Sequence, residues 1–166
     1  MLTRRTLLAT GAIATVPLTS LEALAQNKKD TVVLALTLEP PGLDPTAGAA
    51  SAIGEIVHYN LFETLTKITP EGTVLPLLAQ RWEVAPDSKT FTFHLRQDAQ
   101  FHNGLPLTAD SVQFSFARAA SSTSTNKDKA LFAQLKVTAK DRFTVVIESA
   151  HSNPDLLFLL GQATAI

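Results

Sequence analysis

The sequence predicts a mixed α/β fold that contains a smaller α+β subdomain. Three observations lead to this prediction: a strand-length apolar run over residues 31–37, a strand–turn–strand pattern over residues 81–96, and a well-marked helix start at residues 107–110. A chain of 166 residues with 45% hydrophobic residues is long and apolar enough for one domain with its own core.

The first 25 residues have the order of a cleaved signal peptide. Arg4 and Arg5 give a short positive region, an apolar run covers residues 6–21, and residues 23–25 supply the small-x-small cleavage pattern. We therefore expect cleavage after Ala25 and export to the periplasm. The run is too short and too polar for a stable membrane span, which disfavours an N-terminal anchor.

The export route stays open on the sequence alone. Residues 3–8 resemble a twin-arginine signal but lack the phenylalanine and lysine that complete the usual pattern. Ordinary secretion explains the same segment equally well. Either route leaves a mature domain over residues 26–166.

Composition and charge exclude several classes of function. The net charge is −1 at pH 7 with no concentrated basic stretch, so a nucleic-acid partner is not expected. The chain has no cysteine, which excludes disulfides and thiolate metal sites. Burial of apolar side chains must therefore stabilise the fold.

The beginning of the mature domain reads as strand, loop, helix and strand. Residues 31–37 are continuously apolar and partly β-branched, as expected for a strand covered on both faces. Three prolines and a glycine in residues 39–45 end this strand. A helix follows over residues 51–61, with Ser51 as a candidate N-cap, then a strand over residues 63–68 and a turn at 70–72.

The clearest local pattern is a predicted β-hairpin. Trp82 and Val84 alternate with polar residues before a Pro-Asp-Ser turn, and Phe91 and Phe93 alternate with polar residues after it. This pattern predicts one buried aromatic face and one wet face, with the first pair packed against the two phenylalanines.

Further helices and strands follow the hairpin. Thr108 is the expected N-cap of a helix, Leu107 and Val112 have the spacing of a hydrophobic staple, and Phe116 continues the buried stripe with Ala119 or Ala120. The remaining predicted elements are a short helix at 129–135, strands at 136–138 and 143–148, and a helix through residue 160 with Pro154 in its first position.

No pattern in the sequence indicates an enzyme or a cofactor. Phosphate loops, nucleophile elbows and His-x-x-x-His pairs are absent, and the four histidines are too widely spaced for a metal site. Asp87, Ser88 and His94 point to alternate faces of a hairpin and do not form a triad. Glu39 and Asp44 share one loop without a recognisable pocket. We therefore expect a protein that is not an enzyme.

Four spaced motifs together resemble one family of secreted receptors. They are N-L-F-E-T-L at residues 60–65, E-G-x-V-L-P-x-L-A-x-x-W-E-V at 71–84, D-S-K-T-F-T-F-H-L-R at 87–96 and F-H-N-G-x-P-L-T-A-D-S-V-x-F-S-F at 101–116. The chain resembles the periplasmic solute-binding proteins that serve peptide, nickel and related ABC importers, the bacterial extracellular solute-binding proteins of family 5. The similarity extends to L-D-P at 43–45 and to residues 142–147.

The resemblance implies a bilobal receptor that captures a ligand, usually a short peptide, between two α/β lobes and delivers it to a membrane permease. Such receptors run several-fold longer, so we expect an N-terminal portion that holds one strand of the main lobe plus the α+β subdomain. This portion should bind ligand poorly alone. Peptide, nickel chelate, sugar and opine all remain open as ligands.

The resemblance also implies where a ligand would touch this portion. The loop that leaves the first strand maps onto Leu38, Glu39, Pro40 and Pro41, and the start of the next helix adds Ser51 as a weaker candidate. A strand terminator with a solvated Glu39 explains the same loop equally well. An alternative class is a secreted, non-catalytic interaction or scaffold domain derived from such a receptor.

Overall fold

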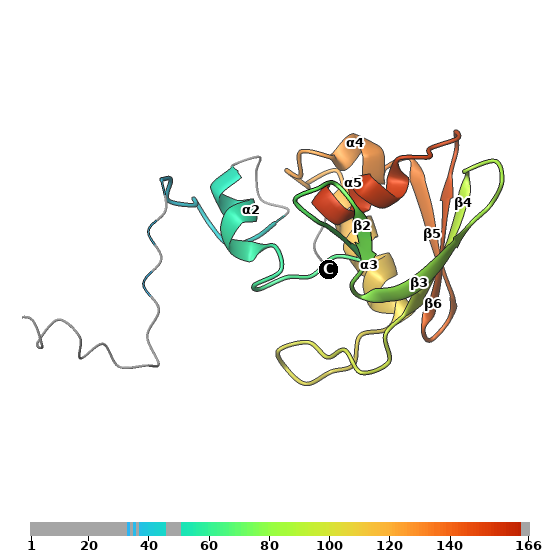
Figure 1. The fold of residues 1–166 in the computed structure, drawn as a ribbon, viewed down its shortest axis with the longest axis horizontal. Coiled ribbons are helices and arrows are strands. Elements are labelled where there is room, and N and C mark those ends of the chain that lie inside the picture. Colours follow the sequence, from blue (N-terminus) through green and yellow to red (C-terminus); the bar gives the residue numbers. More distant parts are fainter. Residues whose placement is uncertain (1–32, 34, 36, 46–50, 164–166) are drawn as a thin grey trace, which may run out of the picture. The chain divides into compact units, whose positions relative to one another are not determined.

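The computed structural model describes residues 33, 35, 37–45 and 51–163 (Figure 1), and the described residues from Thr37 onwards belong to one structural unit. This unit contains both helices and strands, which confirms the predicted mixture of helix and sheet. Its elements are α2 (Ser51–Val57), β1 (Thr66–Ile68), β2 (Val74–Pro76), β3 (Ala79–Val84), β4 (Thr90–Leu95), α3 (Ala109–Ala120), α4 (Lys129–Phe132), β5 (Leu135–Asp141), β6 (Thr144–Ser149) and α5 (Leu156–Ala163). None of these helices is long and apolar enough to cross a membrane.

A four-stranded antiparallel sheet with the order β3-β4-β6-β5 forms the main layer, and β1 and β2 pair separately. The predicted hairpin is confirmed, with Trp82 opposite Phe93 and Val84 opposite Phe91. Phe91 and Phe93 are fully buried, as expected for the inner face of a central strand. Val84, however, is 41% exposed, so its predicted burial is wrong. The reason is that β3 lies at the edge of the sheet and has a neighbour on one side only.

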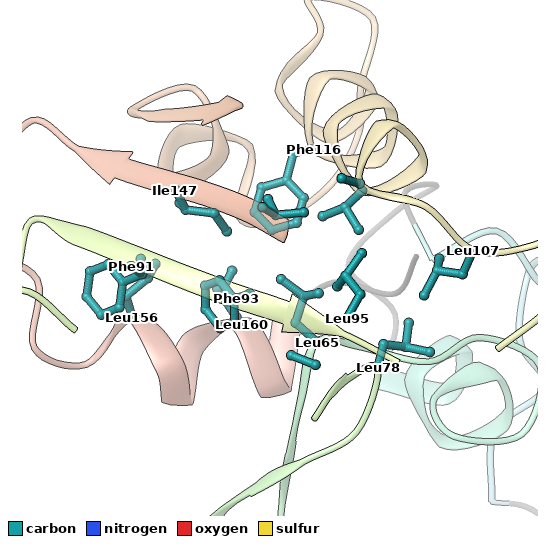
Figure 2. Packing of buried hydrophobic residues seen from close by; sticks show 14 of the residues in the cluster. Leu65, Leu78, Phe91, Phe93, Leu95, Leu107, Phe116, Ile147, Leu156 and Leu160 are labelled. Carbon is teal, nitrogen blue, oxygen red and sulfur yellow. The ribbon is translucent and has the colours of Figure 1, made fainter. Parts of the chain in front are cut away.

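One hydrophobic cluster joins the sheet to the helices, and Figure 2 shows side chains of α3 and α5 meeting those of β4 and β6. Phe116 of α3 packs edge to face against Phe132 of α4, with ring centres 5.3 Å apart. Burying each large apolar side chain in this way contributes about 1.5–3 kcal/mol to the free energy of folding. Ten members of this hydrophobic cluster are labelled in Figure 2: Leu65, Leu78, Phe91, Phe93, Leu95, Leu107, Phe116, Ile147, Leu156 and Leu160.

Helix α3 begins as the sequence predicts. Thr108 is the N-cap, and its backbone N–H donates to Ser111 Oγ at 3.4 Å. The staple residues Leu107 and Val112 are both buried. The buried stripe contains Ala109, Val112, Phe116 and Ala119. On the opposite side of the helix, Phe114 is 69% exposed.

Several predicted boundaries are wrong. Helix α2 ends at Val57 instead of residue 61, because Tyr59 adopts a positive φ of 64°, which no α-helix accommodates. The strand predicted from residue 63 begins at Thr66. Pro154 lies in a turn, and α5 begins two residues later at Leu156.

The predicted strand at residues 31–37 is not formed by its described members. Val33, Ala35 and Thr37 are exposed and outside any strand, and Val33 is 87% exposed. A strand needs a hydrogen-bonded neighbour, and no described strand pairs with these three residues. The other four residues of that prediction, and the predicted signal peptide over residues 1–25, lie outside the described part.

Candidate ligand-binding site

Two adjoining hollows lie between the turn after α2, the loop before α3 and the end of the proline loop. The first, of about 480 Å³, is lined by Leu43, Asp44, Leu61, Phe62, His102 and Arg118. The second, of about 330 Å³, is lined by Tyr59, Asn60, Leu61, Phe62, Glu63, Leu78, Arg96, Ala99, Gln100, Phe101, His102 and Leu107. Leu61, Phe62 and His102 belong to both, so the two hollows form one continuous surface.

The wall at Leu61 and Phe62 is built by a tight turn. The N–H groups of both residues donate to the Val57 carbonyl, at 3.0 and 2.9 Å, and the Tyr59 N–H donates to the Phe62 carbonyl at 2.7 Å. These bonds satisfy the last carbonyl group of α2, that of Val57, and turn the chain back on itself. The N-L-F-E motif therefore presents Leu61, which is 40% exposed, to the hollow.

The wall at Phe101 and His102 is a second tight turn, formed by the F-H-N-G motif. Gly104 has a φ of 80° and donates its N–H to the Phe101 carbonyl at 2.8 Å. Asn103 Oδ1 accepts the N–H of Leu105 at 3.0 Å. The side chain that caps the turn is that of Asn103, whereas His102 lines both hollows.

An ion pair closes one side of the first hollow. Arg118 of α3 donates from Nη2 to Asp44 Oδ2 at 2.6 Å and from Nη1 to Asp44 Oδ1 at 3.3 Å. The hydrogen bond to Asp44 raises the pKa of the Arg118 guanidinium. Sequence reasoning considered Asp44 only as a partner of Glu39, because nothing local links two residues that are 74 positions apart.

A second ion pair lies beside the other hollow. Arg96 binds Asp98 through two hydrogen bonds of 3.0 and 2.9 Å. This contact raises the pKa of Arg96 and lowers that of Asp98. Both arginines that line the hollows thus have a carboxylate partner, while Leu43, Leu61, Phe62 and Phe101 supply apolar surface. A wall of paired charges and apolar groups suits an organic solute with both polar and apolar parts.

The structure separates the predicted ligand residues from these hollows. Leu38, Glu39 and Pro41 are exposed, and Pro40 is half-buried, but none of the four lines either hollow. The same loop reaches the first hollow two residues later, at Leu43 and Asp44. Ser51 begins α2, and its side chain lies outside the described part.

The described residues assemble neither a triad nor a metal centre. Asp87 accepts the N–H of Lys89, and His94 contacts Glu83 at 3.2 Å, so these side chains do not meet at Ser88. In the part of the chain that the structure describes, no group of three or more histidine, aspartate or glutamate side chains is arranged to hold a metal ion.

A family model described as "Bacterial extracellular solute-binding proteins, family 5 Middle" matches residues 73–166. The chain belongs to this family. Its members in the comparison include the periplasmic oligopeptide-binding protein OppA of Haemophilus influenzae, which is 38% identical over 99 residues, covering 58% of this chain and 18% of OppA. The predicted family is therefore confirmed.

Solved structures give the same result for the fold of this family 5 chain. H. influenzae OppA in complex with the peptide RPPGFSPFR aligns with a TM-score of 0.68 and 29% identity, over 74% of this chain and 27% of that one. AgaA from A. tumefaciens R10, in complex with agropinic acid, aligns with a TM-score of 0.70 and 26% identity, over 77% and 26%. The predicted fold class, part of a bilobal periplasmic-binding-protein fold, is confirmed.

The chain spans about a fifth of the length of the curated relatives it matches. These relatives are binding proteins and not enzymes, which agrees at the level of the family with the prediction of a protein without catalytic activity. Two curated relatives, H. influenzae OppA and E. coli YgiS, are named as periplasmic proteins, which agrees at the same level with the predicted location.

Proposed function

We propose that this protein is the substrate-binding component of an ABC import system. It captures a peptide or similar small solute in the periplasm and delivers it to a permease in the inner membrane. The observation that carries the proposal is the family match over residues 73–166, supported by the similarity to a periplasmic oligopeptide-binding protein. The proposal concerns the activity of the whole receptor, because the chain spans only about a fifth of its relatives.

The ligand contacts proposed for this chain are Leu38, Glu39, Pro40, Pro41 and Ser51. The exposure of Leu38, Glu39 and Pro41 supports this proposal, because it leaves their side chains accessible to a ligand. Two consecutive prolines restrict the loop, so little conformational entropy is lost when it binds. The Glu39 carboxylate suits an ammonium group, such as the N-terminus of a peptide.

Thermal denaturation with a panel of solutes tests this function. The protein, expressed from its complete reading frame, is scanned with RPPGFSPFR, trialanine, agropinic acid, a nickel–histidine chelate and free alanine. We expect a peptide to raise the Tm, since a ligand at a hundred times its Kd adds about 2.7 kcal/mol to the stability. Stabilisation by agropinic acid or the chelate alone would disprove a peptide as the ligand but leave the proposed receptor function standing. If no solute in the panel raised the Tm, both the peptide ligand and the receptor function would be disproved.

A matched pair of variants tests the proposed contact at Glu39. Glu39→Gln removes the carboxylate and should weaken binding of RPPGFSPFR in isothermal titration. Glu71→Gln is the control, because Glu71 is exposed in the turn between β1 and β2 and lines neither hollow. Equal affinities for the two variants would remove Glu39 from the site.

The export proposal has its own test. We propose that residues 1–25 are a signal peptide, cleaved after Ala25, and that the mature protein is periplasmic. Intact mass measurement of protein from the periplasmic fraction should give a mature start at Gln26. Replacing Arg4 and Arg5 together by lysine should block a twin-arginine route while leaving ordinary secretion active, so the amount of exported protein distinguishes the two routes.

The alternative is a secreted, non-catalytic scaffold domain derived from such a receptor. The observation that favours it is the exposure of large apolar side chains on α3 and on the loop before it, 69% for Phe114 and 61% for Leu105. A scaffold would form a stable complex with another protein, detectable by size-exclusion chromatography of the periplasmic extract. It would also remain unaffected by every solute in the panel.

A further inference from the structure

The Asp44–Arg118 ion pair links two segments that differ greatly in how firmly they are held. Arg118 lies in the last turn of α3, a helix whose stripe Ala109, Val112, Phe116 and Ala119 is buried in the core. Asp44 lies in the proline loop, and residues 37–43 of that loop make no hydrogen bond within the described part of the chain. The ion pair therefore connects a rigid helix to the end of a loop whose residues 37–43 make no hydrogen bond of their own in the described part.

The geometry of the contact fixes direction as well as distance. Two hydrogen bonds, of 2.6 and 3.3 Å, join the two outer nitrogens of the guanidinium to the two oxygens of one carboxylate. This paired arrangement restricts the angle between the groups, which a single lysine–carboxylate contact cannot do. Pro45 restricts the backbone directly after Asp44, and Pro40 and Pro41 restrict it further upstream, on the other side of Gly42 and Leu43.

The loop passes the first hollow at the same point. Leu43, Asp44 and Arg118 together form one wall of this hollow of about 480 Å³. The ion pair thus sets both the position of the loop and the shape of that wall. We propose that Arg118 is a positioning residue, which acts through Asp44 to hold the proline loop in a binding-ready conformation. Its effect on ligand affinity rests on the proposed function, but its effect on loop position does not.

Loop position can be measured without a ligand. The chain has no cysteine, so Gly42→Cys and Lys140→Cys allow two spin labels to be attached at defined sites. A side chain at Gly42 meets no atom within 4 Å, and Lys140 is exposed on β5. Electron paramagnetic resonance between the labels should give a narrow distance distribution in the labelled parent protein.

Four variants of the labelled protein test the contact. Arg118→Gln and Asp44→Asn should each broaden the distribution, and the exchanged pair Asp44→Arg with Arg118→Asp should narrow it again. Arg96→Gln is the matched control, because it breaks a similar two-bond pair with Asp98 elsewhere and should leave the distribution narrow. The Tm of every variant should stay close to that of the parent, since exposed ion pairs contribute little to global stability.

The outcomes separate the two proposals. A distribution in Arg118→Gln as narrow as in the parent, or a parent distribution already broad, would overturn the positioning role. Titration of the complete protein with RPPGFSPFR should then show an affinity on the order of tenfold weaker for Arg118→Gln, restored by the exchanged pair. A broader distance distribution in Arg118→Gln together with an unchanged affinity would confirm that Arg118 positions the loop. It would overturn the proposal that the proline loop takes part in ligand binding.

Discussion

The phenol hydroxyl of Tyr59 donates a hydrogen bond of 2.8 Å to the backbone carbonyl of Gly161, joining the turn after α2 to the C-terminal part of α5 across 102 positions. A second bond of 2.8 Å, from Thr66 Oγ1 to the Leu157 carbonyl, joins β1 to the same helix. The segments that lead into and out of the four-stranded sheet are therefore held side by side. Tyr59 makes its contact from a positive φ of 64°, a conformation that tyrosine rarely adopts.

Removal of the Tyr59 hydroxyl should weaken this junction. Tyr59→Phe keeps the ring and the backbone but leaves the Gly161 carbonyl without its donor. It also removes the acceptor of a long, exposed hydrogen bond of 3.4 Å from the Ile68 N–H, which water can replace. We expect a loss of about 0.5–1.5 kcal/mol in the free energy of unfolding, the usual net value of one hydrogen bond. Urea denaturation followed by circular dichroism measures it. A stability equal to that of the parent would mean that water replaces the hydroxyl without cost.

A side chain at Gly161 should disrupt the same junction from the other side. A Cβ built there would lie 2.7 Å from Ile68 Cδ1 and 2.9 Å from Ile68 Cγ1, well inside contact distance. We expect Gly161→Ala to destabilise the protein by about 1–3 kcal/mol, as overpacking does, despite the better helix propensity of alanine.

Two further variants check the cause of that destabilisation. Gly42→Ala is the control, because nothing lies within 4 Å of its added Cβ, and its stability should change little. In a double-mutant cycle, Ile68→Ala should recover part of the loss caused by Gly161→Ala. Strictly additive losses would show that the contact with Ile68 is not the cause.

Replacing Phe93 or Phe114 by alanine compares how much a buried and an exposed phenylalanine contribute to the stability of the protein. Phe93 is fully buried at the centre of the sheet, whereas Phe114 is 69% exposed on α3. Phe93→Ala should cost about 3–5 kcal/mol because it opens a cavity. Phe114→Ala should change the stability by less than about 0.5 kcal/mol. Similar losses in thermal unfolding would contradict the burial seen here.

The pH dependence of stability should contain a contribution from His58. Burial, and secondarily the charge of Lys127, lowers the pKa of His58 below its ordinary value of 6.5. The unfolded chain then binds a proton more tightly than the folded chain, so stability falls as the pH drops below about 7 and levels off below the folded pKa.

Urea denaturation between pH 7.5 and pH 5 measures this contribution. His58→Gln should remove it from the pH profile, and Lys127→Gln should reduce it, because burial remains while the charge repulsion is lost. An identical pH profile for His58→Gln and the parent would show that His58 does not contribute.

The candidate site could be predicted only in part. The turn at Phe101–Gly104 follows from its local Asn-Gly motif. The turn at Tyr59–Phe62 was missed, because a helix was predicted through residue 61. The proline loop was predicted to contact a ligand through Leu38, Glu39, Pro40 and Pro41. The sequence did not predict that the end of this loop, at Leu43 and Asp44, lines the first hollow. That position depends on Arg118, and no local pattern connects two residues so far apart in sequence.

The sequence by itself determined the hairpin, with Trp82 and Val84 paired with the two phenylalanines, and the start of α3 at Thr108. Alternation and capping act over a few neighbouring residues, so both leave a local pattern. It also determined the family, through motifs spread along the chain. The tertiary structure alone decided that Val84 is exposed at a sheet edge, that α2 ends before Tyr59, and that Arg118 holds Asp44. These features depend on which segments become neighbours in space. Contacts between residues far apart in the chain produce no local, repeating pattern from which they could be predicted.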